Sequence, residues 1–152
     1  MYRIKRTKYG IHLTFSGHIK AVEMEQWLEE SRGVLSEVEG PFGVFVDMRD
    51  MILLPPESQP AMKRGQMHYR SEGMVRSVVI LRDKVIAMQF QRIAKETGIY
   101  EWERYIDASN EKDWEKIGMD WIIDAIDPDG SSQFNDSARL QLDASDPAHS
   151  SR

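Results

Sequence analysis

Cysteine is absent from the 152 residues of this sequence, which excludes disulfide bridges, thiolate nucleophiles and cysteine-ligated metal sites. No apolar run approaches the roughly 18 residues that a membrane-spanning helix needs, so we expect no such helix. No apolar segment follows the basic N-terminal residues either, so we expect no secretory signal. Together these absences predict a cytoplasmic domain.

Signatures of catalysis and of metal binding are also missing. The sequence has no P-loop, no GxGxxG and no GxSxG motif. Its histidines, His12, His18, His68 and His149, share no metal-ligand spacing. The formal net charge of −5 argues against a nucleic-acid partner, because phosphate binding normally needs a basic surface. We therefore expect no metal, no cofactor and no nucleic-acid ligand.

An uninterrupted apolar segment is the most informative feature that the sequence does contain. Residues 42–46 are apolar or glycine, and Gly40 and Pro41 precede them. Such a run predicts a strand that is buried on both faces. A strand of this kind needs helices above and below it, which indicates an open sheet with parallel connections. The polar Asp47 marks the end of this strand.

The rest of the chain alternates between helical and strand periodicity. The pattern predicts the order β-β-α-β-α-β-α-β-α in one α/β domain over residues 1–126. Right-handed crossovers would give a mostly parallel sheet of about five strands, with helices on its faces and the N-terminal strand antiparallel at an edge. The expected helix boundaries are Gly40 for the first helix, Glu57 or Ser58 for the second, Asp83 and Gly98 for the third, and Ser109 as N-cap of the last.

Residues 127–152 differ in composition from the rest of the chain. They are rich in Asp, Ser, Pro and Gly. Their apolar side chains, Phe134, Leu140 and Leu142, are too few and too scattered to form a core. The sequence therefore predicts a disordered polar tail from Asp127 onward.

The order of elements and several local patterns resemble the SpoIIAA-like branch of the STAS fold, a group of sulfate-transporter and anti-sigma-factor-antagonist domains that is also related in shape to some lipid-carrying domains. Three segments carry this resemblance: residues 45–50, residues 87–98, and residues 103–107 running into the helix of residues 114–121. The resemblance implies a STAS-like fold and a regulatory role in which a partner protein is bound. It covers roughly residues 2–126.

The family's phosphorylation switch uses an Asp-Ser pair at the end of the central strand, and the sequence departs from that pattern. Asp47 matches the strand end, but no Ser or Thr occurs between Asp47 and Glu57. Ser58 is the first hydroxyl after the strand. A phosphate is favoured where a hydroxyl lies at a helix N-terminus. We therefore predict that no phosphorylation switch operates at this strand exit.

Charged side chains follow the central strand directly. Asp47, Arg49 and Asp50 lie where open α/β sheets collect ligands, at the carboxyl ends of the strands. Two carboxylates beside a guanidinium would hold a polar ligand or a charged loop of a partner. The alternative is an ion pair together with a turn-capping Asp, which is common at strand exits.

The connection after the strand is unusually apolar. Met51, Ile52, Leu53 and Leu54 occur in succession before two prolines. They would line a hydrophobic cavity or form a contact surface. The alternative is that they simply cover the core, as a proline-rich loop can. We include these four residues and Ser58 in the candidate binding site.

These observations favour a non-enzymatic binding or regulatory module, acting as a monomer or a homodimer. Its ligand would be a partner protein or a small molecule bound at the carboxyl ends of the strands. One alternative is a carrier of an apolar ligand such as a lipid, because the nine Met side chains pack adaptably. A second alternative is an enzyme that uses Asp47 or Asp50 as a base.

Overall fold

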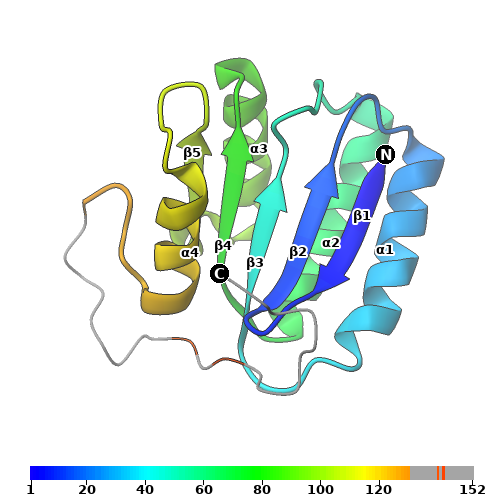
Figure 1. The fold of residues 1–152 in the computed structure, drawn as a ribbon. Coiled ribbons are helices and arrows are strands. Elements are labelled where there is room, and N and C mark those ends of the chain that lie inside the picture. The colour runs from blue at the N-terminus through cyan, green and yellow to red at the C-terminus, as the bar shows by residue number, and fades with distance from the viewer. Residues whose placement is uncertain (131–139, 141, 143–152) are drawn as a thin grey trace.

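The structure, a computed structural model, describes residues 1–130 together with Leu140 and Leu142. These residues form one sheet of five strands in the order β1-β2-β3-β4-β5. Four α-helices and two short 3-10 helices connect and cover the strands (Figure 1). No helix in this part of the chain is long and apolar enough to cross a membrane.

The elements follow one another along the chain as the hydrophobic periodicity indicates. In chain order they are β1 (Tyr2–Arg6), β2 (Gly10–Phe15), α1 (Ala21–Leu35), β3 (Phe42–Asp47), η1 (Pro56–Ser58), α2 (Gln59–Ser71), β4 (Met74–Leu81), α3 (Lys84–Thr97), η2 (Tyr100–Trp102), β5 (Glu103–Asp107) and α4 (Trp114–Asp124). Strand β1 pairs antiparallel with β2, and all other neighbouring strands are parallel. The predicted α/β class with a mostly parallel, five-stranded sheet is confirmed.

The sheet is covered by three helices on one face and by one helix on the other (Figure 1). Successive side chains of β3 point to opposite faces, so Val44 and Val46 pack with α1, α2 and α3. Phe45 lies between them in the sequence and packs against α4, where Trp121 is its largest fully buried neighbour in the cluster. The prediction of a central strand buried on both faces is confirmed.

The expected boundaries of the third helix are confirmed, and those of the first and last helices are wrong. Helix α1 ends at Leu35, before the expected Gly40. Asp83 accepts hydrogen bonds from the backbone N–H groups of Val85 and Ile86, and Gly98 ends α3 with a φ of 85°. Helix α4 begins at Trp114 instead of near Ser109. The side-chain oxygen of Asp107 accepts the backbone N–H of Ser109 at 2.9 Å, so this segment forms a turn before the helix.

The packed part of the chain extends beyond the predicted end of the domain at residue 126. Asp127 is buried, and its carboxylate accepts two hydrogen bonds from Arg104, at 2.8 and 3.0 Å. Leu140 is buried beside Ile122, and its N–H donates to the Ile123 carbonyl. Its predicted lack of packing is therefore wrong. Residues 131–139, 141 and 143–152 of the predicted tail lie outside the described residues.

We predict that a chain ending at Ile126 is less stable than one ending at Gly130 by about 2 kcal/mol, since Arg104 then loses its charge-assisted hydrogen bonds. The two midpoints of urea unfolding measure this difference. The full-length variant Asp127→Asn is the matched control, because it removes the charge without placing a new C-terminal carboxylate near Arg104. Equal stability of the two truncated chains would contradict this prediction and would support a domain that ends at residue 126.

Candidate functional site

The strand-end residues Asp47 and Arg49 form an ion pair. The Arg49 guanidinium donates Nε–H to Oδ1 and Nη2–H to Oδ2 of Asp47, at 3.0 and 2.9 Å. The guanidinium carbon lies 4.2 Å from the centroid of the Trp114 ring. Burial alone would raise the pKa of Asp47, but the hydrogen bonds from Arg49 hold that pKa below its usual value. A carboxylate stabilised in this way is a weak base.

Asp50 pairs with a different arginine, Arg82, and its side chain is exposed to solvent. The Arg82 Nη1–H donates to Asp50 Oδ1 at 2.9 Å, and both side chains are more than half exposed. An exposed pair of this kind contributes little to stability. The ion-pair interpretation of these strand-end charges therefore fits the contacts that Asp47, Arg49 and Asp50 make. Arg49 turns toward α4, whereas Asp50 faces the end of β4.

The four apolar residues of the following connection divide into two pairs. Met51 and Leu54 are buried, with exposed fractions of 5% and 1%, and belong to the main core. Ile52 and Leu53 are each 50% exposed. Both interpretations of this segment thus apply, because the outer residues cover the core and the central two form a surface.

Polar side chains fix the backbone of this loop to the helices behind it. Gln89 of α3 accepts the Leu54 N–H through Oε1 at 2.9 Å and donates Nε2–H to the Leu54 carbonyl at 2.8 Å. Gln59 also donates to this carbonyl, at 3.3 Å. At the other end, the Ile52 N–H donates to the Gly17 carbonyl at 3.3 Å. The loop is therefore hydrogen-bonded on both sides of its exposed residues.

Ile52 and Leu53 belong to a wider apolar surface at the carboxyl ends of the strands. Val85 and Met88 are exposed and lie three residues apart on one face of α3. We call Ile52, Leu53, Val85 and Met88 the carboxyl-edge patch. An open groove of about 690 Å³ is lined by three of these residues and by His18. Of the predicted site residues, Ile52 and Leu53 in this patch and Asp50 outside it are exposed.

Ser58 does not reach this surface. Its side chain is fully buried, and its hydroxyl donates to the Ile19 carbonyl at 2.8 Å. A hydrogen bond in this direction anchors the start of α2 to the segment before α1. Ser58 was included in the candidate site, and its burial places it in the core instead.

We predict that Ser58 is not phosphorylated in the folded protein, because its hydroxyl is inaccessible and already hydrogen-bonded. Incubation with kinases of the host followed by mass spectrometry tests this directly. The variant Ser58→Asp should lower the free energy of unfolding by several kcal/mol, since it buries an unpaired charge. Stoichiometric phosphate on Ser58 in native protein would contradict the prediction.

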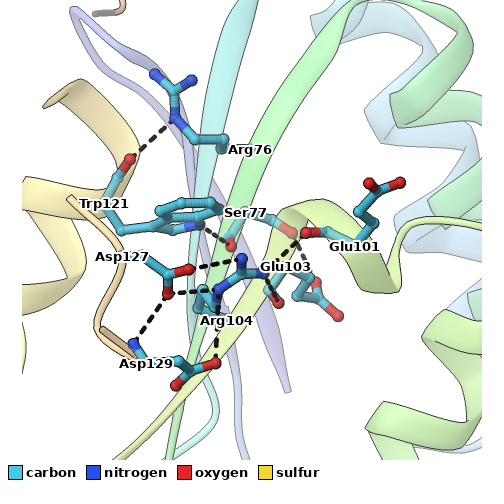
Figure 2. A network of polar contacts seen from close by, with 8 residues as sticks. All are labelled: Arg76, Ser77, Glu101, Glu103, Arg104, Trp121, Asp127 and Asp129. Atoms are coloured by element: carbon cyan, nitrogen blue, oxygen red, sulfur yellow. Dashed lines mark hydrogen bonds and ion pairs between the residues drawn. The ribbon is translucent and has the colours of Figure 1, made fainter. Parts of the chain in front are cut away.

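A second polar cluster lies along β5, a segment that sequence reasoning did not identify as a site. Figure 2 shows Arg104 between the Trp121 ring and the carboxylates of Asp127 and Asp129. The guanidinium carbon of Arg104 lies 4.3 Å from the centroid of the indole ring, whose Nε1–H donates to the Ser77 carbonyl at 2.9 Å. These contacts join β4, β5 and α4 to the segment after α4.

Glu103 is the most unusual residue of this cluster. Its side chain is buried and accepts a hydrogen bond from the Ser77 hydroxyl at 2.7 Å and another from the Tyr105 hydroxyl. Burial raises the pKa of Glu103 to about 7, although both hydroxyls favour the ionised form. A perturbed carboxyl in the interior is a recognised mark of a functional site. Strand alternation alone could have placed Glu103 inside, on the same face as Tyr105.

Glu103 also borders a small cavity between the sheet and the three helices. The cavity measures about 40 Å³ and is lined mainly by apolar side chains, with Ser77 and Tyr69 among the polar ones. It has room for about one or two water molecules, whereas pockets for small-molecule ligands generally measure about 300–1,000 Å³.

The chain was compared with known proteins. No protein-family model matches it, and the curated proteins contain no match to it. The resemblance to the STAS fold therefore stays a prediction from the sequence.

Proposed function

We propose that this chain is a binding module that holds an amphipathic helix of a partner protein on the carboxyl-edge patch. The observation that carries the proposal is the loop itself, which exposes Ile52 and Leu53 while its flanking residues are buried. Such exposed apolar side chains cluster at interaction sites, because their burial by a partner is favourable. The resemblance of the sequence to the STAS fold, if it holds for the structure, favours the same role.

The loop is arranged to bind with little loss of entropy. Gln89 already holds both backbone groups of Leu54, and two prolines follow at Pro55 and Pro56. A loop that is ordered before binding avoids much of the entropy cost of association.

A helix is the partner element that we infer for this surface. The patch combines the loop with Val85 and Met88 on α3, and its groove of about 690 Å³ can accept apolar side chains. Helical ligands present apolar residues at i, i+3, i+4 and i+7, which suit an elongated apolar groove. Arg92 follows Met88 by four residues on the same face of α3, so an acidic residue at the end of the bound helix would be favourable.

The two alternative functions receive less support. A carrier of a lipid tail needs an interior far larger than the 40 Å³ cavity beside Glu103. A base at Asp47 would have to overcome the hydrogen bonds from Arg49, which hold its pKa low. Asp50 is exposed and forms an ion pair with Arg82, so its carboxylate already has a cationic partner.

The test is a selection of helical peptides from a displayed library on the immobilised chain. We expect Leu53→Asp to weaken binding of the selected peptides by at least tenfold, about 1.4 kcal/mol, because a carboxylate then replaces an apolar contact. Val22→Asp is the matched control, since Val22 is exposed on α1 outside the patch. Titration of labelled peptides by fluorescence anisotropy gives the affinities.

The control variant should bind the selected peptides like the unmodified chain. Circular dichroism and urea unfolding should show that both variants keep the fold. The proposal is wrong if the selected peptides bind the Leu53→Asp chain as tightly as the unmodified chain, or if no helical peptide is enriched.

A further inference from the structure

The buried carboxyl of Glu103 lies between the interior cavity and the molecular surface. On its outer side is a pocket of about 370 Å³ at the free edge of β5, whose lining includes Glu103, Tyr100 and Tyr105. Glu101 and Asp129 line the same pocket. Gln91 and Arg104 complete the lining. Glu103 therefore belongs both to the core and to a surface pocket that holds tyrosine rings, further acidic groups and one arginine, whose guanidinium pairs with Asp127.

The Glu103 carboxyl has no cationic partner within the described part of the chain. Only the hydroxyls of Ser77 and Tyr105 donate to it. Arg104 follows Glu103 directly, but neighbouring residues of a strand point to opposite faces, and the Arg104 guanidinium pairs with Asp127. Buried carboxylates are ordinarily paired with a cation, because the loss of solvation is otherwise not compensated.

We propose that the β5-edge pocket binds a small primary alkylammonium ion, with Glu103 as its counter-ion. This site is separate from the carboxyl-edge patch and does not depend on the function proposed for it. The ammonium group would donate to Glu103 beside the Tyr105 hydroxyl, since an ionised carboxylate has about four acceptor positions and two are used.

The aromatic rings of the pocket are suited to a cation. Tyr100 and Tyr105 are stacked with their centroids 6.4 Å apart. The Lys95 ammonium already lies 4.7 Å from the centroid of Tyr100, so this ring holds an ammonium group in the present structure. The alkyl chain of the ligand would contact the second ring, Tyr105, and the carboxylate of Glu101 adds to the negative potential.

Binding should depend on pH through the ionisation of Glu103. An alkylamine stays protonated up to about pH 10, as Lys does, so only the protein changes charge near neutrality. With its pKa at about 7, Glu103 is mostly neutral at pH 6 and mostly ionised at pH 8. The titratable group that faces Glu103 is Tyr105, which stacks on Tyr100. Burial raises the pKa of Tyr105 further above its ordinary value of 10, so Tyr105 stays neutral in this interval. The charged side chains of the pocket and its rim are Lys95, Glu101, Asp129 and the paired Arg104.

The experiment uses n-butylammonium chloride as the probe and the full chain as the protein. Titration followed by two-dimensional NMR should show saturable shifts of the Tyr105 and Glu103 amides at pH 8. The apparent affinity should be about tenfold weaker at pH 6, because the binding-competent fraction falls by that factor. Glu103→Gln should abolish binding, and Glu111→Gln, a change of an exposed carboxyl outside the pocket, should leave binding unchanged.

Three results would overturn the proposal. The first is no saturable shift at pH 8 in the tens of millimolar range. The second is equal binding of n-butanol, which has the same chain without the charge and would report an apolar contact only. The third is binding that survives in Glu103→Gln, whose retained fold is shown by the rest of its NMR spectrum.

Discussion

Glu103→Gln should raise the free energy of unfolding at pH 8 by about 3 kcal/mol. The carboxyl has a folded pKa of about 7 against an ordinary value of 4.5, so the folded state binds the proton more tightly than the unfolded state. Stability must then fall as pH rises from about 4.5 through about 7, and the full penalty is present above that interval. At about 1.4 kcal/mol for each pH unit of difference, the loss reaches about 3 kcal/mol. A glutamine carries no charge at any of these pH values, so the variant escapes this loss.

Urea unfolding between pH 4 and pH 8.5 measures the effect. The two chains should be nearly equal in stability at pH 4, and their difference should grow up to about pH 7.5. The amide retains hydrogen-bonding groups toward Ser77 and Tyr105, so no cavity is created. Glu111→Gln serves as the control for removing a surface carboxylate. A constant difference between the Glu103→Gln and unmodified chains at all pH values would show that burial does not raise the pKa of Glu103 as described.

Trp121→Ala should lower the free energy of unfolding by about 3–5 kcal/mol, the range for core aromatic truncations. Its side chain is fully buried, and its Nε1–H donates to the Ser77 carbonyl. Its ring also lies beneath the Arg104 guanidinium. The substitution therefore removes apolar burial, one hydrogen bond and one cation–π contact together. Urea unfolding at pH 6 gives the value.

Trp114→Ala is the matched comparison on the same helix and should cost about 1–2 kcal/mol. Trp114 is only partly buried. Its ring centroid lies 6.3 Å from that of Phe45, and the Arg49 guanidinium lies over its ring. Because Trp114 buries less apolar area than Trp121, its removal loses less of the free energy gained by transferring apolar surface out of water. Equal losses for the two tryptophans would contradict the way that α4 is oriented on the sheet.

The periodicity of the sequence predicted the fold well because burial follows it closely. The apolar run at residues 42–46 identified a strand covered on both faces, and its flanking helices lie where that strand requires them. The period-3.6 pattern also indicated α4, but it could not distinguish Trp114 from Trp121. Both positions are aromatic in the sequence, and only the tilt of the helix on the sheet decides which is fully buried.

The sequence predicted where the charged residues of the candidate site lie, but not which residues they contact. Strand-end logic placed Asp47 and Asp50 correctly at the carboxyl edge, but the sequence cannot show that Arg49 turns to Trp114 while Asp50 pairs with Arg82. Ser58 was misplaced because its hydroxyl meets the Ile19 carbonyl across 39 residues of chain.

The β5 cluster was missed for a related reason. Glu103 and Asp127 are residue types that usually lie on the surface. Glu103 is buried beside Ser77 of β4, and Asp127 is buried beside Arg104 of β5. Charged residues are rarely buried unless they are paired, so a sequence reading assigns them to solvent. For Glu103 the one local signal was its alternation with Tyr105 along β5. The pairing of Asp127 with Arg104 spans 23 residues and has no local signature.

The hydrogen bonds from Gln89 have a consequence for how this surface can change. Gln89 hydrogen-bonds to the backbone N–H and carbonyl of Leu54, and these bonds do not involve the side chains at positions 52 and 53. Those two positions can vary in size, shape and charge while the loop keeps its path. Specificity and stability are thus determined by different residues of one short segment. The loop is therefore a natural place to diversify in a library of engineered binders, with Met51, Leu54 and Gln89 kept constant.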